Sequence, residues 1–492
     1  MIGTKQKYIC ISRPRRFGKT MAAEMLTAYY SCGSDSGDLF ANLKIASEPS
    51  YKKHLNKYNV IFLNMQEFLS NYHEVELMIK KITESINRDI LEEYSDFDFT
   101  YIDNILGTMK ELFKVSGIPI VFIIDEWDSI FRDKKSNKDS QEIYLDFLRN
   151  LLKDQKYVAL AYMTGILPIK KYKTHSALNM FREFSMTNPK EMSEFVGFTQ
   201  DEVIALCKKH KMNYDEMAEW YDGYCFSNLK NVYNPKSVVE AIFSRQFDNY
   251  WSQTETYEAL KDYIKKNYDG LKDAIILLLA GERKKIDIKS FTNDMVTFES
   301  YNDVLTLLIH LGYLGYDFET KEVFIPNKEI SDEFETAVKN VGWDEITSLL
   351  NESDGLLKAT WNMDSLAVAE AIEEAHNNET SIIKYNDENA LSCVLSIAYF
   401  SARQYYIIER EIPAGKGLVD LFFRPRENHL DKPAMLIELK WDKSAMGAIK
   451  QIEDKKYTDI LKEYKENAMI IGINYDKNSK KHECIIRRYN DI

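Results

Sequence analysis

The sequence has little cysteine, and no two of its cysteines have the spacing of a zinc knuckle or a redox pair. The six cysteines are scattered over the chain: Cys10, Cys32, Cys207, Cys225, Cys393 and Cys484. A disulfide scaffold is therefore excluded, and a reducing compartment is the simpler interpretation. The sequence also has no Gly-x-Ser-x-Gly motif, so it offers no serine-hydrolase nucleophile elbow.

Long apolar runs and an excess of positive charge are missing too. The longest uninterrupted apolar run, AIILLLA at 274–280, is far below the roughly 18 residues that span a bilayer, and MIGTKQKYICIS at the start has no signal-peptide stretch. We therefore expect a soluble, cytoplasmic protein. Because 64 Lys and Arg stand against 77 Asp and Glu, a net charge of −13, any polyanion site must be local.

The length of 492 residues predicts two to four domains, at about 100 to 200 residues each. With 45% apolar and 29% charged residues and no low-complexity segment, nearly all of the chain should fold. Short β-branched runs alternate with amphipathic stretches over the first 170 or so residues, which predicts a parallel α/β sheet. The expected strands are KYICIS at 7–12, NVIFLNM at 59–65, IPIVFIID at 118–125 and YVALAYMTG at 157–165.

The pattern changes twice further along the chain. Helical periodicity comes first, with a helix start at Asn234-Pro235, and a hairpin around 319–321 then suggests a winged helix. A helix, three strand-like runs, a second helix and a further strand follow, which predicts a compact α/β domain. The expected domains are 1–195, 196–345 and 346–492.

A candidate phosphate loop follows the first expected strand. The string RPRRFGKT at 13–20 leads into a helical stretch, so Gly18, Lys19 and Thr20 stand at a helix N-terminus, where free amides and the helix dipole favour an anion. Lys19 can then bridge terminal phosphates, and the Thr20 hydroxyl can ligate magnesium. The tripeptide alone is expected by chance in roughly one chain in four of this length, so its context must carry the hypothesis.

An acidic strand end supplies that context. The string VFIIDEWD at 121–128 ends in Asp125 and Glu126 at the carboxyl edge of the same expected sheet. Asp125 could hold magnesium through water, and Glu126 could polarise the attacking water. Thr164, at the end of another strand, could sense the terminal phosphate or could cap the next turn. Together these residues predict binding of ATP with Mg²⁺.

The loop departs from the usual pattern at its start. Arg13 stands where the first glycine of a phosphate loop is usual, and Pro14, which has no N–H, follows it. Fewer amides therefore face a phosphate at this end. Arg15 and Arg16, next to Phe17, either compensate by charge or form a solvated basic turn.

A second constellation lies on two apolar strands near the C-terminus. Asp420 interrupts GLVDLFFR, and Glu438 and Lys440 interrupt AMLIELKW. Strand alternation puts Glu438 and Lys440 on one face. If the two strands pair, two carboxylates could bind Mg²⁺ and the lysine could orient water for phosphodiester hydrolysis. The alternative is a structural Lys–Glu pair at a sheet edge.

Neighbouring residues could complete this second site. Glu388 on the preceding helix could add a carboxylate, and Gln451, Lys455 and Lys456 on the following helix could meet a phosphate. Residues 381–492 carry 19 Lys and Arg against 17 Asp and Glu, a charge of +2 that leaves −15 on the remainder. The C-terminal part is therefore the one that tolerates a polyanion.

The motifs taken in order resemble a known family. These strings are RPRRFGKT, FLNM, IIDEWD, TGI, FVGFTQDEV, WYDGYCF, VYNPKSVV, LGYL, IPNKEI, GLVDLFF, IELKW and QIEDKKY. Over nearly the full length the chain is similar to bacterial AAA-ATPase-like proteins that carry a C-terminal PD-(D/E)XK nuclease-superfamily domain. The resemblance implies a P-loop NTPase parallel sheet, a helical and winged-helix middle, and a restriction-endonuclease-like α/β domain at the C-terminus.

The resemblance also implies roles for individual residues. Lys19 with Thr20 matches the phosphate-loop pair, and Asp125 with Glu126 the acidic pair. The nuclease triad is matched by Asp420, Glu438 and Lys440, with Glu388 and Gln451 as accessories. An arginine at position 13 is a family trait, whereas members usually have a longer segment before the first strand, so the start codon is misassigned or an edge element is absent. Tyr221, Asp222, Gly223 and Tyr224 are a family hallmark, which we interpret as a helix-terminating turn with packed aromatics.

We expect an ATP-dependent or ATP-regulated DNA nuclease of defence or mobile-element biology, and a homo-oligomer is compatible with this. One alternative is a nucleotide-switched module whose inactive nuclease-like domain only binds nucleic acid or a protein. Another is an ATPase that acts alone on a protein substrate. Arg182 is a candidate arginine finger, or a surface residue.

Overall fold

The computed structural model of the chain contains two units. Unit 1 comprises Met1–Gln253 and Lys285–Ile330, and unit 2 comprises Thr254–Lys284 and Ser331–Ile492. The residues that the structure describes are 2, 6–102, 104–133, 137–169, 178–226, 229–251, 256–265, 268, 270–291, 298–379, 388–464 and 467–491. Each unit is built from two separate stretches of chain, and the three-domain boundaries expected from the sequence stay a prediction.

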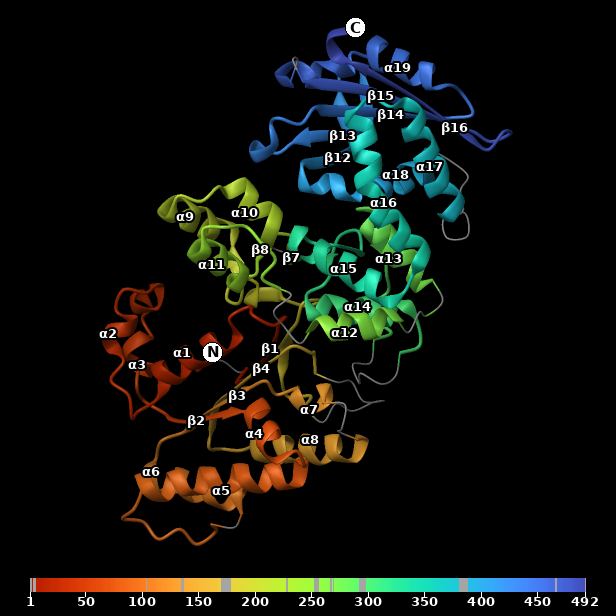
Figure 1. Cartoon of the computed structure of the whole chain (residues 1–492). Coiled ribbons are helices and arrows are strands. Elements are labelled where there is room, and N and C mark those ends of the chain that lie inside the picture. The colour runs from red at the N-terminus through yellow and green to blue at the C-terminus, as the bar shows by residue number, and fades with distance from the viewer. Residues whose placement is uncertain are drawn as a thin grey trace. The chain divides into compact units, whose positions relative to one another are not determined.

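A parallel sheet forms the centre of the first part of unit 1 (Figure 1). Its order is β2-β3-β4-β1-β5, and every neighbouring pair of strands is parallel. The strands are β1 (Tyr8–Ser12), β2 (Asn59–Asn64), β3 (Ile120–Asp125), β4 (Val158–Gly165) and β5 (Arg182–Phe184). Four of them confirm the runs expected from the sequence, and β3 is buried along its whole length, as an apolar central strand requires. The three-residue β5 was not anticipated.

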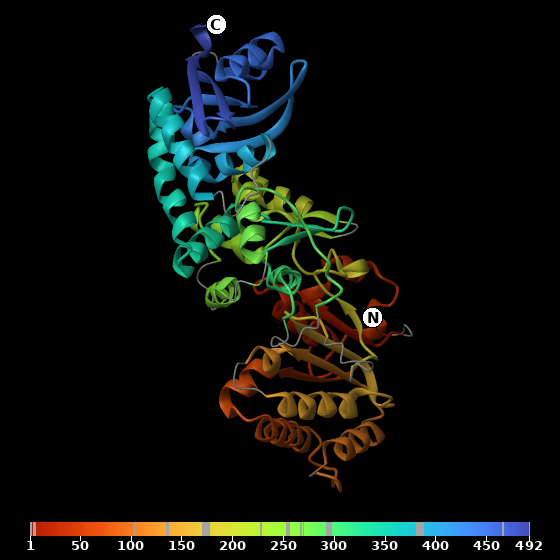
Figure 2. The ribbon, with the colours of Figure 1, turned by 90° about the vertical axis from the view of Figure 1, so that its right-hand side faces the viewer.

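Helices connect these strands. They are α1 (Lys19–Tyr30), α2 (Gly37–Phe40), α3 (Tyr51–His54), α4 (Met65–Tyr72), α5 (Val75–Glu93), α6 (Ile105–Ser116), α7 (Ser129–Arg132) and α8 (Lys138–Leu152), with the 3₁₀ turn η1 (Lys44–Ser47). α5 packs against α6 and α8, and Figure 2 shows these three helices on the same side of the sheet. The ends of α6 follow local chemistry, because the Asn104 side chain accepts from two helix amides and Gly117 ends the helix at a φ of 65°.

The rest of unit 1 is mainly helical, as expected. It contains α9 (Gln200–His210), α10 (Tyr214–Tyr221), α11 (Pro235–Ser244) and α14 (Tyr301–Leu311), η2 (Lys190–Met192), and the short strands β6 (Phe198–Thr199), β7 (Tyr224–Phe226), β8 (Leu229–Tyr233), β10 (Gly315–Asp317) and β11 (Glu322–Phe324). The Asn234 side chain caps α11, which begins at Pro235, as the sequence predicts. β10 and β11 pair antiparallel directly after α14, which confirms the helix and hairpin of the expected wing.

Unit 2 is a mixed sheet with helices. Its helices are α12 (Thr256–Lys265), α13 (Leu271–Leu279), α16 (Asp344–Trp361), α17 (Ser365–Glu379), α18 (Glu388–Ala398) and α19 (Ala445–Asp454), with η3 (Phe400–Gln404), η4 (Glu427–His429), η5 (Tyr457–Tyr464) and η6 (Tyr489–Asp491). The strand β9 (Lys284–Lys285) and the helix α15 (Lys328–Val341) contain residues of both units. The strands of the sheet are β12 (Tyr406–Ala414), β13 (Gly417–Pro425), β14 (Ala434–Trp441), β15 (Ala468–Asp476) and β16 (Lys481–Arg488).

The second sheet mixes antiparallel and parallel neighbours. β12, β13 and β14 pair antiparallel, α19 then crosses to β15, which is parallel to β14, and β16 closes the order β12-β13-β14-β15-β16. The expected order of helix, three strands, helix and strand is confirmed, and β16 is an addition. Among the helices of the described ranges, none is both long enough and apolar enough to cross a membrane.

Candidate active sites

The turn that follows β1 has the backbone of an anion-binding loop. α1 begins at Lys19, and the preceding Gly18 has a φ of 85°, a left-handed conformation that favours a residue without Cβ. Arg16 is left-handed as well, with a φ of 69°. The first amides of a helix have no acceptor within the helix and lie at the positive end of its dipole. The expected strand, loop and helix N-terminus are therefore present at residues 8–30.

The expected polar side chains meet where β3 and β4 end. The Thr20 hydroxyl donates to Asp125 Oδ2 at 2.7 Å, and the Thr164 hydroxyl donates to Asp125 Oδ1. Asp125 and Thr164 are fully buried, whereas Thr20 is exposed. β4 lies between β3 and β1 in the sheet, and this order brings three distant segments together. A carboxylate that receives two hydroxyls is thus placed next to the loop.

Lys19 is held inside the loop. Its ammonium Nζ donates to the Pro14 carbonyl at 2.8 Å, and its side chain is almost completely buried. Burial lowers the pKa of Lys19, while the negative charges of Glu126 and Asp128 raise it. The lysine is therefore a desolvated cation among carboxylates, suited to an anionic phosphate.

Glu126 is held by a residue that sequence reasoning missed. It follows β3 directly with a φ of 54°, and Arg132 on α7 forms ion pairs with Glu126 and with Asp128. Asp128 is completely buried and also accepts the amides of Ile166 at 3.0 Å and Leu167 at 2.8 Å. The available signal was the spacing of Asp128 and Arg132, which face each other one helical turn apart.

Arg13, the unusual first residue of the loop, is buried and hydrogen-bonded to three backbone carbonyls. The Arg13 side chain is completely buried and donates to the carbonyls of Ser12 and Phe184, both at 3.0 Å, and Met192 at 3.3 Å. Burial lowers the pKa of Arg13 to about 10, so its guanidinium stays charged at neutral pH.

The three residues that follow Pro14 differ in burial. Arg15 is half-buried, and Phe17 is buried. Arg16 is half-buried as well, and its guanidinium donates to the Tyr250 carbonyl at 2.7 Å.

The residues of the second predicted cluster lie on two paired strands. β13 and β14 pair with Leu421 opposite Ile437, and one step further the Leu439 amide donates to Asp420 Oδ2 at 2.6 Å. Lys440 Nζ lies 3.0 Å from Glu438 Oε1. Glu438 and Lys440 are buried and Asp420 is half-buried. The three side chains therefore lie on neighbouring strands at one place in the sheet.

The accessory residues of this cluster have different outcomes. Gln451 on α19 donates to Glu438 Oε1, so the helix that follows β14 adds an amide to the cluster. Lys455 and Lys456 are exposed at the C-terminal end of α19. Glu388 begins α18, but its side chain lies outside the described residues.

Both clusters suit magnesium by their chemistry. Mg²⁺ takes hard oxygen ligands, and it usually binds one or two carboxylates while keeping several waters. The first cluster offers Asp125 with the Thr20 hydroxyl, and the second offers Asp420 and Glu438. Among the side chains that the structure describes, no group of three or more His, Cys, Asp or Glu is placed to hold a metal ion. The site roles stay predictions.

Two further sequence predictions concern the surface and the thiols. Arg182 on β5 is 41% exposed, pairs with Glu191 and stacks on Phe184 at 5.2 Å, which is the environment of a surface residue. All six cysteines are free thiols.

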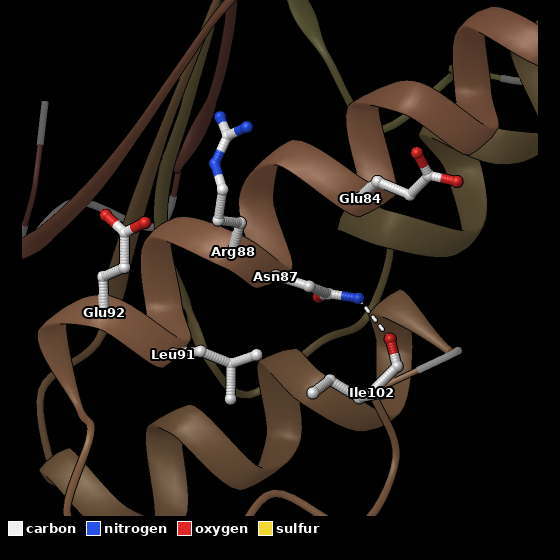
Figure 3. A pocket seen from close by; sticks show the side chains of 6 residues that line it. All are labelled: Glu84, Asn87, Arg88, Leu91, Glu92 and Ile102. Carbon is white, nitrogen blue, oxygen red and sulfur yellow. Dashed lines mark hydrogen bonds between the residues drawn. The ribbon is translucent and has the colours of Figure 1, made fainter.

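A shallow pocket lies along α5 in unit 1, and its lining contains no residue of either cluster. Figure 3 shows the residues that line it: Glu84, Asn87, Arg88, Leu91, Glu92 and Ile102. The Asn87 side chain donates to the Ile102 carbonyl, so this polar group ties α5 to the segment before α6. Its open, mixed-charge lining has no constellation of catalytic groups.

Comparison with known proteins identifies both ends of the chain. Residues 1–175 match the family model described as a predicted AAA-ATPase, and residues 386–484 match the model of the PD-(D/E)XK nuclease superfamily. These matches confirm the two domains that the motifs led us to expect. No curated protein matches the chain.

Several solved structures show a distant likeness. ORC2 of Aeropyrum pernix, in ADPNP–ADP complexes, is 10% identical, with 68% of this chain and 88% of that chain covered and a TM-score of 0.32. Cdc6p of Pyrobaculum aerophilum is 12% identical over 68% of this chain and 87% of its own, with a TM-score of 0.25. ORC1 of Aeropyrum pernix, in complex with DNA, is 9% identical over 69% of this chain and 87% of its own, with a TM-score of 0.23.

Proposed function

Residues 1–175 form a AAA-ATPase-like domain and residues 386–484 a PD-(D/E)XK nuclease-superfamily domain, and we propose that together they make an ATP-regulated, Mg²⁺-dependent DNA nuclease. The observation that supports the proposal is the position of Asp420, Glu438 and Lys440 on the paired strands β13 and β14, in a chain that also holds a loop like a phosphate loop. We propose defence or mobile-element biology as its setting. A cytoplasmic location and a homo-oligomeric state stay predictions.

At the first site, separate groups would bind the phosphates of ATP, hold Mg²⁺ and orient the attacking water. The loop amides and the Lys19 ammonium would bind the phosphates of ATP. Thr20 and Asp125 would hold Mg²⁺, which neutralises charge on the phosphate oxygens when bound. Glu126 would orient the attacking water, and Arg132 keeps the Glu126 carboxylate in position through their ion pair. Thr164, bonded to Asp125, links the end of β4 to the same carboxylate.

At the second site, the same reasoning gives Asp420 and Glu438 as ligands of Mg²⁺, which supplies Lewis-acid stabilisation of a phosphodiester when bound. Lys440 lies next to Glu438 and would orient the attacking water or the phosphate. Gln451 fixes the rotamer of the Glu438 carboxylate from α19. The Glu438 and Lys440 side chains are buried, so their charges act in a medium that strengthens electrostatic interactions.

One observation favours a second candidate function. Glu438 accepts from both Lys440 and Gln451, as a purely structural pair in a sheet would. In that case the domain would bind nucleic acid or a protein partner under nucleotide control without cutting.

A paired assay of ATP turnover and DNA cleavage with Mg²⁺ separates these functions. We expect Lys19→Ala to lower ATP turnover by about 100-fold or more, and Asp420→Ala to lower cleavage by a similar factor while ATP turnover continues. Two variants serve as matched controls. Lys7→Ala removes a lysine at the opposite end of β1, where Nζ donates to the Val158 carbonyl, and Glu409→Ala removes a carboxylate from the neighbouring β12.

The outcomes are distinct. Equal cleavage by the wild type and Asp420→Ala would end the nuclease proposal. DNA binding that responds to ATP, with no cleavage by the wild type, would establish the binding module instead. ATP turnover that is indifferent to DNA in a protein that does not bind DNA would leave an ATPase acting on another substrate.

A further inference from the structure

The turn Tyr221–Phe226, which neither proposed activity uses, lies against the phosphate loop. The Tyr224 ring packs edge-on against Phe17, with ring centroids 5.2 Å apart. The Arg13 guanidinium lies 4.6 Å from the centre of the Phe226 ring. All four side chains are buried. Tyr224 and Phe226 therefore contact the loop at Phe17 and at Arg13.

The hydroxyl of Tyr224 adds a second attachment. It donates to the Gly312 carbonyl at 2.6 Å, at the end of α14. Gly312 has a φ of +89°, and a Cβ there would lie 2.7 Å from the Pro14 side chain. Tyr224 thus positions the segment that packs directly on Pro14, the loop residue without an N–H.

A third attachment comes from Arg16. Its guanidinium donates to the Tyr250 carbonyl at 2.7 Å, and the Tyr250 amide donates to Glu329 Oε1 at 2.8 Å. Glu329 is buried and also accepts the Ser237 hydroxyl at 3.0 Å. The loop is thereby connected through backbone groups to the first turn of α15.

The turn itself is fixed to the residues that precede α15. Gly223 has a φ of +106°, and a Cβ there would approach the Pro326 carbonyl oxygen to 2.0 Å, so only glycine fits. The Asn327 side chain donates to the Asp222 carbonyl at 2.7 Å. A shift of the turn would therefore move residues 326–327.

The contacts of Tyr224 and Phe226 are made with a loop that lacks the usual first glycine. Ordinary phosphate loops are shaped by a glycine at the position where this chain has Arg13, and their early amides help to set the phosphate-binding conformation. We propose that Tyr224 and Phe226 are positioning residues for the phosphate loop, through which nucleotide binding and the Tyr221–Phe226 turn are coupled. The inference rests on the proposed ATP binding and adds its regulation, because the same turn is fixed to the start of α15.

The test measures MgATP affinity and amide exchange in the full-length protein. Tyr224→Phe keeps the ring on Phe17 and loses only the hydroxyl, and Phe226→Leu removes the aromatic face over Arg13. We expect the Kd for MgATP to rise about fivefold in Tyr224→Phe and about fivefold in Phe226→Leu. The matched control is Tyr157→Phe, which loses a hydroxyl that donates to the Leu151 carbonyl at 2.6 Å. Tyr157 directly precedes the N-terminal end of β4, whereas Thr164 lies at its C-terminal end.

We expect Tyr157→Phe to lower the melting temperature about as much as Tyr224→Phe but to leave the Kd unchanged. Hydrogen–deuterium exchange measures whether MgATP binding protects the turn, which a purely structural role of Tyr224 and Phe226 would not produce. In the wild type, MgATP should slow the exchange of residues 221–226 several-fold and leave α9 unchanged.

An unchanged Kd in Tyr224→Phe, an equal rise in Tyr157→Phe, or no MgATP-dependent protection of 221–226 would each overturn the inference while ATP binding itself stands. A wild type that does not bind MgATP at all would overturn the proposed ATP site, and this inference with it.

Discussion

Buried polar side chains gather at the ends of β1, β3 and β4, where they have no packing advantage. Ser12, Asp125, Asp128 and Thr164 are all completely buried or nearly so. Burial of such groups costs free energy unless hydrogen bonds compensate, and each accepts or donates to a neighbour here. Their concentration at one edge of the sheet supports the proposed ATP site.

Thr164 gives a sharp test of the first site. Thr164→Val keeps the shape and removes the hydroxyl that donates to Asp125. A hydrogen bond to a carboxylate contributes about 1.5 to 3 kcal/mol, so we expect ATP turnover to fall roughly 10- to 100-fold, with KM changed less than kcat. Steady-state kinetics measure this, and Thr164→Ser, which restores the hydroxyl, should recover most of the rate. Wild-type turnover in Thr164→Val would show that the hydroxyl only caps the turn.

Some of these residues could be predicted and others could not. The carboxyl ends of parallel strands meet at one edge, so strand assignment predicts that Asp125 and Thr164 lie close together, and the Gly-Lys-Thr string adds Lys19. By contrast, the partners of Arg16 and Phe17 are Tyr250 and Tyr224, which lie in another part of unit 1. No local pattern marks such contacts, because they depend on how distant segments pack.

β16 shows the corresponding limit for secondary structure. Its sequence, KHECIIRR, mixes charged and apolar residues, and only one face of this edge strand is buried, against α17. Strands buried on both faces, such as β3, β14 and β15, have continuous apolar sequences and were easily recognised. An edge strand with charges on its open face looks like a loop until its partner is known.

The packing of α17 on β16 should make unit 2 sensitive to acid. His376 Nδ1 lies 3.2 Å from His482 Nε2, the two side chains are 3% and 8% exposed, and both rings pack on Tyr475. Burial lowers the pKa of His376 to about 4 and, with the nearby His376, that of His482 to about 3. The carboxylate of Glu373 accepts the backbone amide of His482 at 3.4 Å.

The sign of the effect follows from proton uptake. The pKa of a histidine in the unfolded chain is near 6.5. Below that pH the unfolded chain therefore binds protons, whereas the two buried histidines of the folded protein stay neutral. The contribution of the pair to stability is therefore complete above about pH 6.5. It falls as the pH drops to about 4 for His376 and to about 3 for His482, by up to about 1.4 kcal/mol per pH unit for each histidine. Urea denaturation of wild type and His482→Gln at several pH values checks this. Equal slopes in the two proteins would contradict it.

ATP control of a nuclease needs a free-energy coupling between two sites that belong to different units. The phosphate loop lies in unit 1, whereas Asp420 and Glu438 lie in unit 2. The helix α15 contains residues of both, since Lys328, Glu329 and Ile330 belong to unit 1 and its later residues to unit 2. Glu329 in its first turn accepts from Ser237 and Tyr250, so the loop has a connection to this helix.

Linkage makes this coupling measurable without any cleavage. Asp420→Ala should bind DNA without cutting it, so equilibrium affinities can be measured with and without MgATP. If ATP changes the Kd for DNA by a given factor, DNA must change the Kd for ATP by the same factor, and couplings of about 1 to 3 kcal/mol correspond to roughly 5- to 150-fold. We expect the two factors to agree, and to vanish together when Lys19→Ala is added to Asp420→Ala. If DNA affinity is indifferent to MgATP while both substrates bind, the two activities are independent and ATP does not regulate the nuclease.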